Sequence, residues 1–474
     1  MYGKAFIAVL LTRVGPQAIM IPIQVIVIFY LEKAFTPLVK KYLCKEEKVD
    51  IDTYLDTFDK FTKDPNLDAM KFLMEKYDNP QDKLKVIHVA GTNGKGSVCE
   101  MLSSVLVKSG YKVGKFISPH LIRFNDGIYI NNEEIKDEEV EDIMDELSGY
   151  IKEYNKKNKV PVKWFEAITA LSLIYFAKNN CDLVILETGL GGTTDCTNIA
   201  NSFISIITNI GYDHVDILGN SIEKIAKHKA GIIKKDTDTI CVYQEDVINV
   251  IEEKCKEENT KLHVIKEEDI KNYEYEEKLD LQKFEYKEYK NVEINLKGKV
   301  QTQNAAEVLE CIDILKAKGY KIEEKSIYEG LKTVIHKARM EVLSKDPLII
   351  FDGGHNENAI NNLRQNTDQY LSNKKRLYIV SNLKTKDYKT NIKILCEDKD
   401  AVFFFTGGNN KNRYVSKNKL YSEALKYSNN NIYKYDFKDA LEIAKKGYPD
   451  YAILIVGSFY VYKTACEVLE NDKN

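Results

Sequence analysis

Residues 85–102, KVIHVAGTNGKGSVCEML, constrain the fold of this chain more than any other stretch. Residues 85–90 are rich in Val and Ile, which is typical of a buried strand. After the glycine-rich turn, apolar residues recur at helical spacing, and these are Val98, Met101, Leu102, Val105 and Leu106. We expect that helix to end at Gly110. The stretch therefore predicts a strand, a tight turn and a helix in immediate succession.

The turn has the chemistry of a phosphate-binding loop. Gly91, Gly94 and Gly96 allow backbone N–H groups to approach an anion closely, and the start of the helix adds a partial positive charge. Lys95 would supply the counter-charge, and Ser97 would supply a hydroxyl. The match to the general G-x-x-x-x-G-K-[ST] pattern is incomplete, because its first glycine is absent and Gly96 separates the lysine from the hydroxyl. The alternative is an ordinary glycine-rich turn with an exposed lysine.

Strand-like runs alternate with helical stretches after this loop, at residues 113–118, 181–188, 202–210 and 239–244. Such alternation predicts an α/β fold, with a mostly parallel sheet and helices on both of its faces. Residues 260–300 change to short alternating runs rich in Tyr, Lys and Glu, which predict antiparallel strands or a hairpin. A helix is expected at about residues 303–318.

A second alternating series begins at Leu348 and predicts a smaller, Rossmann-like α/β domain. We interpret residues 332–347 as the connection to it. The regions that we expect are an N-terminal extension at 1–46, a P-loop-type domain at 47–336 and the smaller domain at 337–474. A cleft between two such domains is the expected place for chemistry.

Charge and cysteine content limit the partners and the compartment. The net charge is −3, so nothing draws the chain to nucleic acid or to an anionic membrane. Nine cysteines are scattered without a C-x-x-C pair. This pattern favours a reducing, cytoplasmic location over a disulfide framework or a zinc site.

The N-terminal extension allows three interpretations. Residues 19–31 are strongly apolar but shorter than the roughly 20 residues of a membrane span. A small-residue cleavage site, as in a signal peptide, does not follow clearly. A packed or partly disordered extension, a membrane-associating segment and a start codon assigned too far upstream all remain open.

Seven further stretches follow in the order and spacing of one family. They are SPHLIRFNDGI (118–128), FEAITALSLIYF (165–176), ILETGLGGTTDCTN (185–198), ITNIGYDHVDILGNSIEKIAKHKAGIIK (207–234), QNAAEVL (303–309), DGGHNENA (352–359) and VGSFY (456–460). Together they resemble the folylpolyglutamate synthase and dihydrofolate synthase family of the Mur ligase superfamily, over about residues 47–470. The resemblance implies an ATP-dependent ligase that joins L-glutamate to a folate or pteroate carboxylate through an acyl phosphate, and that could act as a monomer.

The resemblance also implies roles for individual residues in binding ATP and Mg²⁺. Nucleotide contacts would come from the loop and from the second half of the chain, at Gly91, Thr92, Asn93, Gly94, Lys95, Gly96, Ser97, Asn304, Arg339 and Asp352. Metal ligands would be Ser97, Glu166, His214 and Lys229, with Lys229 carbamylated. Lys95, Lys229 and His355 would be catalytic, and His355 would lie beside the transferred group. Lys386 and Asp387 also match the family pattern.

Several of these residues have simpler alternatives. Glu166 lies on an apolar helix, where an unpaired carboxylate is costly, so a buried salt bridge is its alternative to metal binding. His214 could be a satisfied core histidine, since His is an unusual ligand for Mg²⁺. Lys229 could be a surface lysine on a helix. Asp352 and His355 could be ordinary turn residues, and Asp387 could begin a helix.

The chain departs from the family pattern at three places. His228 stands where Glu is usual, Thr193 stands where Arg is usual, and HKAR at His336–Arg339 replaces Trp-Pro-Gly-Arg. A threonine cannot reproduce the bidentate anion contact of a guanidinium, so acceptor binding or a second activity could differ. The alternative functions are a Mur-type ligase acting on a peptidoglycan precursor and a non-catalytic paralogue that binds nucleotide or folate.

Overall fold

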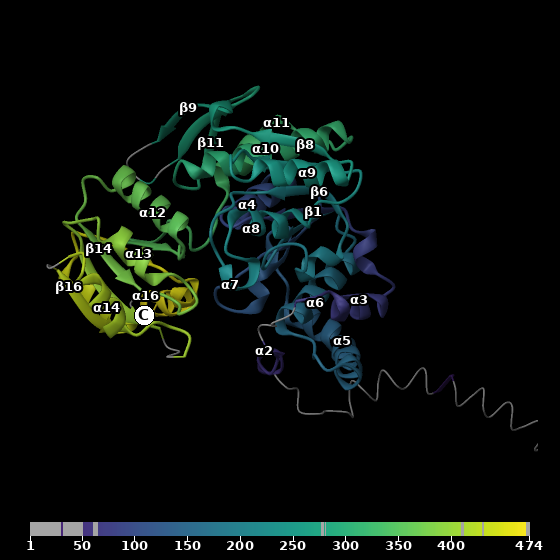
Figure 1. Cartoon of the computed structure of the whole chain (residues 1–474), viewed down its shortest axis with the longest axis horizontal. Coiled ribbons are helices and arrows are strands. Elements are labelled where there is room, and N and C mark those ends of the chain that lie inside the picture. The colour runs from purple at the N-terminus through teal and green to yellow at the C-terminus, as the bar shows by residue number, and fades with distance from the viewer. Residues whose placement is uncertain are drawn as a thin grey trace, which may run out of the picture. The chain divides into compact units, whose positions relative to one another are not determined.

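The computed structural model describes residues 30–31, 51–59, 65–275, 279, 281–408, 412–428 and 431–470. The chain divides into two units between Thr57 and Phe58. In the first unit the structure describes one short helix, α2 (Ile51–Asp56). The predictions for residues 1–46 fall almost entirely outside the described residues. The second unit contains three sheets with their helices (Figure 1).

An eight-stranded sheet forms the larger part of the second unit. In sheet order its strands are β4 (Glu133–Glu134), β3 (Ile128–Ile130), β2 (Val113–Phe116), β5 (Leu183–Glu187), β1 (Val86–Ala90), β6 (Ser202–Ile207), β7 (Asp238–Val242) and β8 (Lys261–Ile265). The strands β2, β5, β1, β6, β7 and β8 are parallel. Strand β3 pairs antiparallel with β2, and β4 pairs antiparallel with β3 at the edge of the sheet. The central strand β1 is buried along its whole length, as its Val and Ile content predicts.

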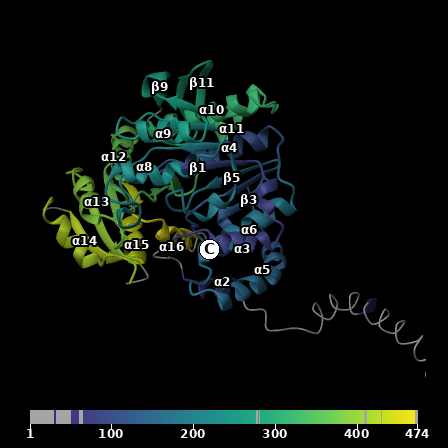
Figure 2. The same cartoon turned by 45° about the vertical axis from the view of Figure 1, so that its right-hand side comes forward.

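Helices cover both faces of this sheet. They are α3 (Asp68–Glu75), α4 (Lys95–Lys108), α5 (Asp137–Lys157), α6 (Trp164–Lys178), α7 (Val215–Leu218), α8 (Ile222–Ala230), α9 (Ile248–Glu257), α10 (Val300–Ala317) and α11 (Glu324–Thr333). Figure 2 shows α4 and α6 on opposite sides of β1 and β5. The apolar stripe predicted for α4 is fully buried and packs against α10 and α11. Helix α4 ends just before Gly110, whose φ is +87°.

Short 3-10 turns occur at five places in the described part of the second unit. They are η1 (Pro80–Lys83), η2 (Phe124–Gly127), η3 (Cys196–Ile199), η4 (Glu267–Asp269) and η5 (Phe459–Val461).

The region predicted to be antiparallel, residues 260–300, divides between two sheets. Its first run, β8, pairs parallel with β7 and is the edge strand of the large sheet, so the prediction was wrong for that run. The remainder forms a three-stranded antiparallel sheet of β9 (Ile270–Tyr275), β10 (Gln282–Tyr286) and β11 (Tyr289–Ile294). The three antiparallel strands confirm the rest of the prediction.

A six-stranded sheet forms the C-terminal part of the unit. In sheet order its strands are β12 (Glu341–Lys345), β13 (Leu348–Asp352), β17 (Ala452–Val456), β14 (Arg376–Val380), β15 (Val402–Gly407) and β16 (Ile432–Asp436). Its helices are α12 (Glu357–Tyr370), α13 (Tyr388–Leu395), α14 (Lys417–Ala424), α15 (Phe437–Gly447) and α16 (Tyr462–Glu470). Strand β12 pairs antiparallel with β13. Residues 332–347 are therefore more than the predicted connection, because they include an edge strand of this sheet.

The predicted fold class is confirmed by these sheets. A mostly parallel sheet contains the P-loop-type turn after its central strand, and a smaller, mostly parallel sheet with helices on both sides follows in the chain. The exact boundaries at 46/47 and 336/337 stay a prediction. Among the described residues, every helix is too short or too polar to cross a membrane.

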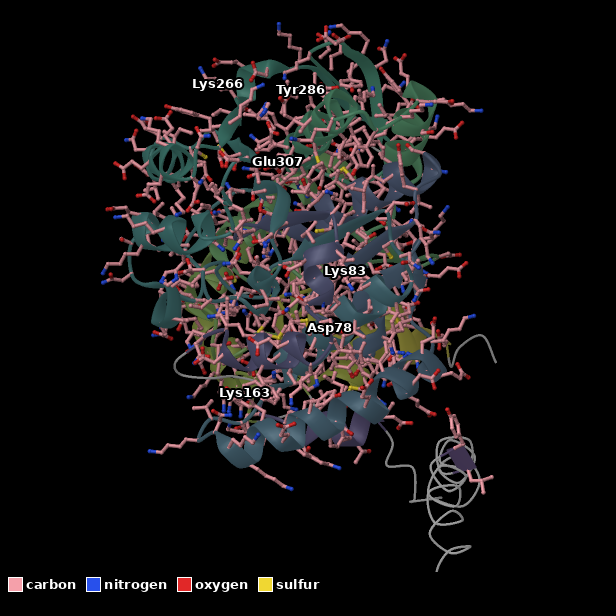
Figure 3. All side chains as sticks on the ribbon, turned by 90° about the vertical axis from the view of Figure 1, so that its right-hand side faces the viewer. Asp78, Lys83, Lys163, Lys266, Tyr286 and Glu307 are labelled. Carbon is pink, nitrogen blue, oxygen red and sulfur yellow. The ribbon has the colours of Figure 1, made fainter. Side chains whose placement is uncertain are left out.

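Two glutamates one turn apart on α10 have opposite environments. Glu310 accepts hydrogen bonds from Lys287 and from Tyr286 at 3.0 Å, and it lies 2.9 Å from Nδ1 of His263. Glu307 is fully buried, and neither carboxyl oxygen has a hydrogen-bond partner among the described residues. Burial raises the pKa of Glu307 well above its ordinary value. Figure 3 labels Glu307 and Tyr286 among the surrounding side chains. Glu307 is therefore a protonated acid that costs stability.

We expect Glu307→Met to raise the free energy of unfolding by about 1–3 kcal/mol at neutral pH, because it removes an unsatisfied buried polar group. The unfolded chain loses the Glu307 proton above about pH 4.5, whereas the folded chain keeps it. The wild-type contribution therefore falls as pH rises, and the gain from Met should be larger at pH 7.5 than at pH 4.5.

Urea unfolding of both proteins at several pH values measures this difference. The matched control is Glu310→Met on the same helix, which should lower stability, because it leaves Lys287 without its carboxylate and removes one of the two carboxylates that contact His263. A destabilised Glu307→Met variant with intact packing would contradict the argument.

Candidate active site

The turn between β1 and α4 is packed so closely that only glycine fits at two of its positions. A Cβ on Gly91 would lie 1.7 Å from Oγ1 of Thr208, and a Cβ on Gly94 would lie 2.6 Å from Oδ1 of Asn304. Gly94 also has φ +96°, in the left-handed region. The Thr208 hydroxyl donates to the Asn93 carbonyl at 2.8 Å and so fixes the turn. The result is a bare backbone cradle at the start of α4, as a phosphate requires.

Lys95, the first residue of α4, lies against a carboxylate at the end of the neighbouring strand β5. Its Nζ is 3.8 Å from Oε1 of Glu187, and the Glu187 side chain is only 5% exposed. The backbone N–H of Ser118 donates to the other carboxylate oxygen at 3.1 Å. Burial raises the pKa of Glu187, while Lys95 and the Ser118 N–H oppose that rise. The lysine is thus held at the loop with a paired negative charge beside it.

Ser97 is buried at the start of α4 and contacts a residue far away in the sequence. Its Oγ lies 3.2 Å from Nδ1 of His336, in the segment that leads to β12. The same imidazole faces Gly96, where a Cβ would lie 3.0 Å from the ring. Burial lowers the pKa of His336 far below its ordinary value, and the cations of Arg339 and Lys115 lower it further. The ring is therefore neutral.

Lys229 is buried on α8 and forms a hydrogen bond with the phosphate loop. Its Nζ donates a hydrogen bond of 2.6 Å to the carbonyl oxygen of Gly91, and the residue is only 4% exposed. Burial, followed by the charge of Lys95, lowers the pKa of Lys229 to about 7. The alternative of a surface lysine is therefore wrong, and a neutral amine is available near physiological pH.

His214 lies after β6 in the left-handed region, with φ +49°. Its Nε2 accepts a hydrogen bond from Nζ of Lys386 at 3.1 Å, and the same ammonium is 2.5 Å from Oδ1 of Asp213. Burial and the Lys386 charge lower the pKa of His214 to about 4. Burial alone would raise the pKa of Asp213, but the charge of Lys386 lowers it. The imidazole is neutral and close to the surface rather than a core histidine.

Asp352, the last residue of β13, and Arg339, just before β12, lie in the same region. The Asp352 carboxylate accepts hydrogen bonds from the N–H groups of Met340 at 3.0 Å and Gly354 at 2.8 Å. Burial raises the pKa of Asp352, and the nearby Arg339 charge opposes this rise. The Arg339 guanidinium also lies over the ring of Phe459, 4.6 Å from its centroid. These contacts fix the backbone just before β12 and just after β13.

His355 has a defined ring orientation. Its Nδ1 lies 2.8 Å from the carbonyl oxygen of Gly353, so Nδ1 carries the hydrogen and Nε2 is the acceptor nitrogen. The ring packs edge-on against Phe459, with centroids 5.6 Å apart. Burial and the Lys386 charge lower the pKa of His355 to about 3, so the ring is neutral.

Hydrogen bonds join the phosphate loop directly to the loop after β13. The side-chain amides of Asn93 and Asn356 bond to each other in both directions, at 3.3 and 3.1 Å. Asn356 also donates to Asp213 at 3.3 Å. Residues predicted from two distant parts of the sequence therefore lie together at the carboxyl ends of strands from both large sheets.

Asn304 lies next to the loop but makes its own contact elsewhere. It is buried on α10, donates to Gln301 at 2.9 Å, and presents its Oδ1 to Gly94. Asp387 begins α13 and accepts hydrogen bonds from the N–H groups of Lys389 and Thr390, both at 3.2 Å. Asp387 therefore has the helix-start contacts of its alternative interpretation.

Glu166 does not join the predicted metal ligands in this structure. Its carboxylate accepts a hydrogen bond of 2.7 Å from the N–H of Lys163 and so caps the start of α6. No contact of Glu166 with the phosphate loop, His214 or Lys229 is seen among the described residues. The carboxylate at the loop is Glu187, which sequence reasoning missed. Its position at the carboxyl end of β5, next to β1 in the sheet, was the signal that could have identified it.

The donors at this site fit magnesium bound with a nucleotide. The Ser97 hydroxyl and the Glu187 carboxylate are hard oxygen ligands, and His214 adds a neutral nitrogen. Among the described residues, no three His, Cys, Asp or Glu side chains form a preassembled metal cluster. A magnesium ion that keeps water and phosphate oxygens needs only a few protein ligands.

We expect Gly94→Ala to weaken ADP binding at least tenfold, because the new methyl group would collide with Asn304 and strain the left-handed backbone. Gly110→Ala is a matched control, since Gly110 has φ +87° with open space around its Cβ position. That variant should lose stability without losing ADP affinity. Calorimetric ADP titration and thermal unfolding of both variants check this, and equal ADP affinities would contradict a tight phosphate cradle.

Comparison with known proteins agrees with this geometry. The Mur ligase middle domain matches residues 89–312, and the glutamate ligase domain of Mur ligases matches residues 338–459. A dihydrofolate synthase/folylpolyglutamate synthase of Bacillus subtilis is 34% identical over 358 residues, covering 73% of this chain and 82% of that protein.

Two solved structures share the fold. The folylpolyglutamate synthase of Thermotoga maritima has a TM-score of 0.76 at 27% identity, covering 93% of this chain and 98% of that one. E. coli FolC, solved in complex with DHPP and ADP, has a TM-score of 0.77 at 26% identity, covering 89% of this chain and 97% of that one. With a phosphate loop, both Mur ligase domains and relatives aligned over most of its length, the chain belongs to the dihydrofolate synthase/folylpolyglutamate synthase family of the Mur ligase superfamily.

Proposed function

We propose that this chain uses ATP to join L-glutamate to the carboxylate of a folate or a dihydropteroate, releasing ADP and phosphate. The family membership and the named relatives support this activity. The observation that carries it is the hydrogen-bonded contact between Asn93 of the phosphate loop and Asn356 of the β13 loop. A carboxylate is amidated only where the transferred phosphoryl group, the acid and the amine meet, and this contact brings the two halves of such a site together.

At the phosphate end, the loop N–H groups and Lys95 bind the terminal phosphates. The lysine is paired with Glu187 in the absence of nucleotide, at 3.8 Å, so its ammonium already points to the loop. In the nucleotide complex the phosphates replace much of that pairing. This arrangement stabilises charge as the phosphoryl group moves to the acceptor carboxylate and forms an acyl phosphate.

Ser97, Glu187 and His214 would hold the magnesium ion. When bound, the ion neutralises phosphate charge and acts as a Lewis acid. Glu187 contributes a carboxylate that is already oriented by the N–H of Ser118. His214 contributes a nitrogen that Lys386 now contacts, so Lys386 must release Nε2 when His214 binds the ion. Glu187 takes the place that was predicted for Glu166.

Lys229 supports the loop and fits the family's carbamylated lysine. Its amine donates to the Gly91 carbonyl, and its pKa of about 7 leaves a substantial neutral fraction at physiological pH. A neutral amine is the form that reacts with carbon dioxide. Carbamylation would turn the amine into a carboxylate-like oxygen ligand near His214.

The amine-binding end is formed by the six-stranded sheet. His355 presents Nε2 as a hydrogen-bond acceptor for the incoming amino group, and its orientation is fixed by the Gly353 carbonyl and by Phe459. Lys386 supplies a cation that is held at the same place by Asp213. We assign to Arg339 and Asp352 contacts with the nucleotide phosphate and ribose, and to Asn304 a contact with adenine.

Thr193 stands at a position that would affect binding of the acceptor acid. Thr193 uses both its N–H and its hydroxyl on the carbonyl oxygen of His228, at 2.8 and 3.1 Å. The guanidinium that the family usually has there is absent, which removes one anion contact.

Both parts of the site come from one chain, which supports a monomeric enzyme. The eight described cysteines are free, which supports a cytoplasmic location.

A mass-spectrometric product screen tests the activity and identifies the acceptor. The chain is incubated with ATP, Mg²⁺ and L-glutamate together with dihydropteroate, reduced folates, folate polyglutamates or a muropeptide precursor. We expect a glutamylated pteroate or folate and phosphate release that depends on both substrates. Lys95→Ala should lower the rate by about 10²–10³-fold, because it removes charge stabilisation of the transferred group.

Two outcomes of this screen would contradict the proposal. Product formed only with the muropeptide precursor would assign the chain to Mur-type ligation. Tight ADP binding without product from any acceptor would assign it to nucleotide or folate binding without catalysis.

Glu187 and Glu166 can be distinguished by the magnesium dependence of the activity. We expect Glu187→Gln to raise the Mg²⁺ concentration at half-maximal rate at least tenfold, because it weakens a direct ligand. Glu166→Gln should leave that concentration unchanged and lower the free energy of unfolding by about 1 kcal/mol, through a weaker helix cap. If only Glu166→Gln alters the magnesium dependence, the assignment of Glu187 is wrong.

A further inference from the structure

His336 occupies a position where this chain differs from its family. The family usually has Trp at this place, and the indole nitrogen of Trp only donates hydrogen bonds. A neutral imidazole carries one acceptor nitrogen as well as a donor. The Nδ1 atom of His336 lies 3.2 Å from Oγ of Ser97. In the tautomer with its hydrogen on Nε2, His336 therefore directs an acceptor at the Ser97 hydroxyl.

The backbone holds His336 firmly against the loop. On one side the Asn295 side chain donates to the carbonyl of Val334 at 3.0 Å, and on the other the N–H of Gly353 donates to the carbonyl of Ala338 at 2.9 Å. The neighbouring side chains point outward, since Ile335 is 67% and Lys337 is 46% exposed. His336 alone of these three turns inward.

The ring also fits tightly over Gly96. A Cβ at that position would lie 3.0 Å from both Cε1 and Nε2 of His336. The imidazole therefore packs directly against the backbone next to Ser97. With the hydrogen on Nε2, its Nδ1 accepts the Ser97 hydroxyl hydrogen and leaves the oxygen lone pairs directed away from the ring.

The geometry points to His336 as a positioning residue that orients the Ser97 hydroxyl for the magnesium ion and increases the electron density on its oxygen. This inference rests on the proposed function, because it assumes that Ser97 is a magnesium ligand. Partners of this kind around a metal ligand typically change metal affinity by about 10–100-fold. His336 acts here through Ser97 and does not itself contact the nucleotide.

Manganese binding to the full chain in the presence of ADP provides the test, with free Mn²⁺ measured by electron paramagnetic resonance. His336→Phe keeps a ring of similar size without an acceptor and should weaken Mn²⁺ binding about tenfold. His336→Asn keeps an acceptor near the Nδ1 position and should restore affinity to within about threefold of wild type. Lys337→Ala, on the same segment but outward-facing, should bind Mn²⁺ as the wild type does.

A double-mutant cycle distinguishes positioning from a structural role. If His336 acts through the hydroxyl, His336→Phe should cost nothing further in a Ser97→Ala background. Metal-free ADP affinity should be the same for wild type and His336→Phe, and thermal unfolding should show that both variants fold. The inference would be overturned if His336→Phe lowered Mn²⁺ affinity equally in the wild-type and the Ser97→Ala background. Unchanged Mn²⁺ affinity in His336→Phe would also overturn it.

Failure of the proposed function gives a different result. If wild type binds no Mn²⁺ with ADP, or if Ser97→Ala leaves Mn²⁺ affinity unchanged, Ser97 is not a metal ligand. The proposed role of Ser97 and the role of His336 that rests on it are then both wrong. If Ser97→Ala weakens Mn²⁺ binding and His336→Phe does not, only the role of His336 is wrong.

Discussion

The hydrogen bond from the Lys229 amine to the Gly91 carbonyl is the interaction on which the site depends most. It connects α8 to the first residue of the phosphate loop across 138 positions of sequence, in a place where the lysine is almost fully buried. A lysine is rarely buried without a strong reason, because the charged form loses its hydration. With a pKa of about 7, Lys229 can be buried in its neutral form. Its hydrogen bond then fixes the backbone of the loop that we propose binds phosphate.

The other charged groups of the site form oppositely charged pairs, which lowers the free-energy cost of burying them. Lys386 is balanced by Asp213, Lys95 by Glu187, and Arg339 by Asp352, and one partner in each pair comes from the end of a parallel strand or from the loop that follows it. Three cations in so small a region would repel each other without these carboxylates. A nucleoside triphosphate and an acidic acceptor would bring further negative charge to the same region. The three cations are already held in positions where they can bind that charge.

The fold was largely predictable, because the strand, turn and helix of residues 85–110 have strong and distinct periodicities. Edge strands were harder to predict. Strand β8 is half-exposed and charged, and β12 lies within a segment that reads as a connection, so neither has the continuous apolar run of a central strand. The parallel or antiparallel direction of such a strand is decided by its neighbour in the sheet rather than by its own residues.

The structure brings several of the predicted site residues together, but the contacts of Glu166 and Glu187 differ from those expected from the sequence. Glu166 was assigned to the metal because a buried carboxylate needs a partner, but a glutamate at the third position of a helix finds that partner in the backbone N–H before the helix. Glu187 lies in an apolar strand whose last residue gives no periodic signal of its own. Only the order of strands in the sheet shows that it faces Lys95, and that order is a property of the folded chain.

The short segment between the two large sheets has a mechanical consequence. Val334 and Ala338 are both held by hydrogen bonds, so any rotation of the six-stranded sheet against the eight-stranded one must be taken up by the backbone of residues 335–337. His336 lies in the middle of those three pivot residues and contacts Ser97. A rotation of one lobe would therefore displace Ser97, the proposed ligand of the magnesium ion, and if Ser97 binds the ion, a bound ion would in turn resist that rotation.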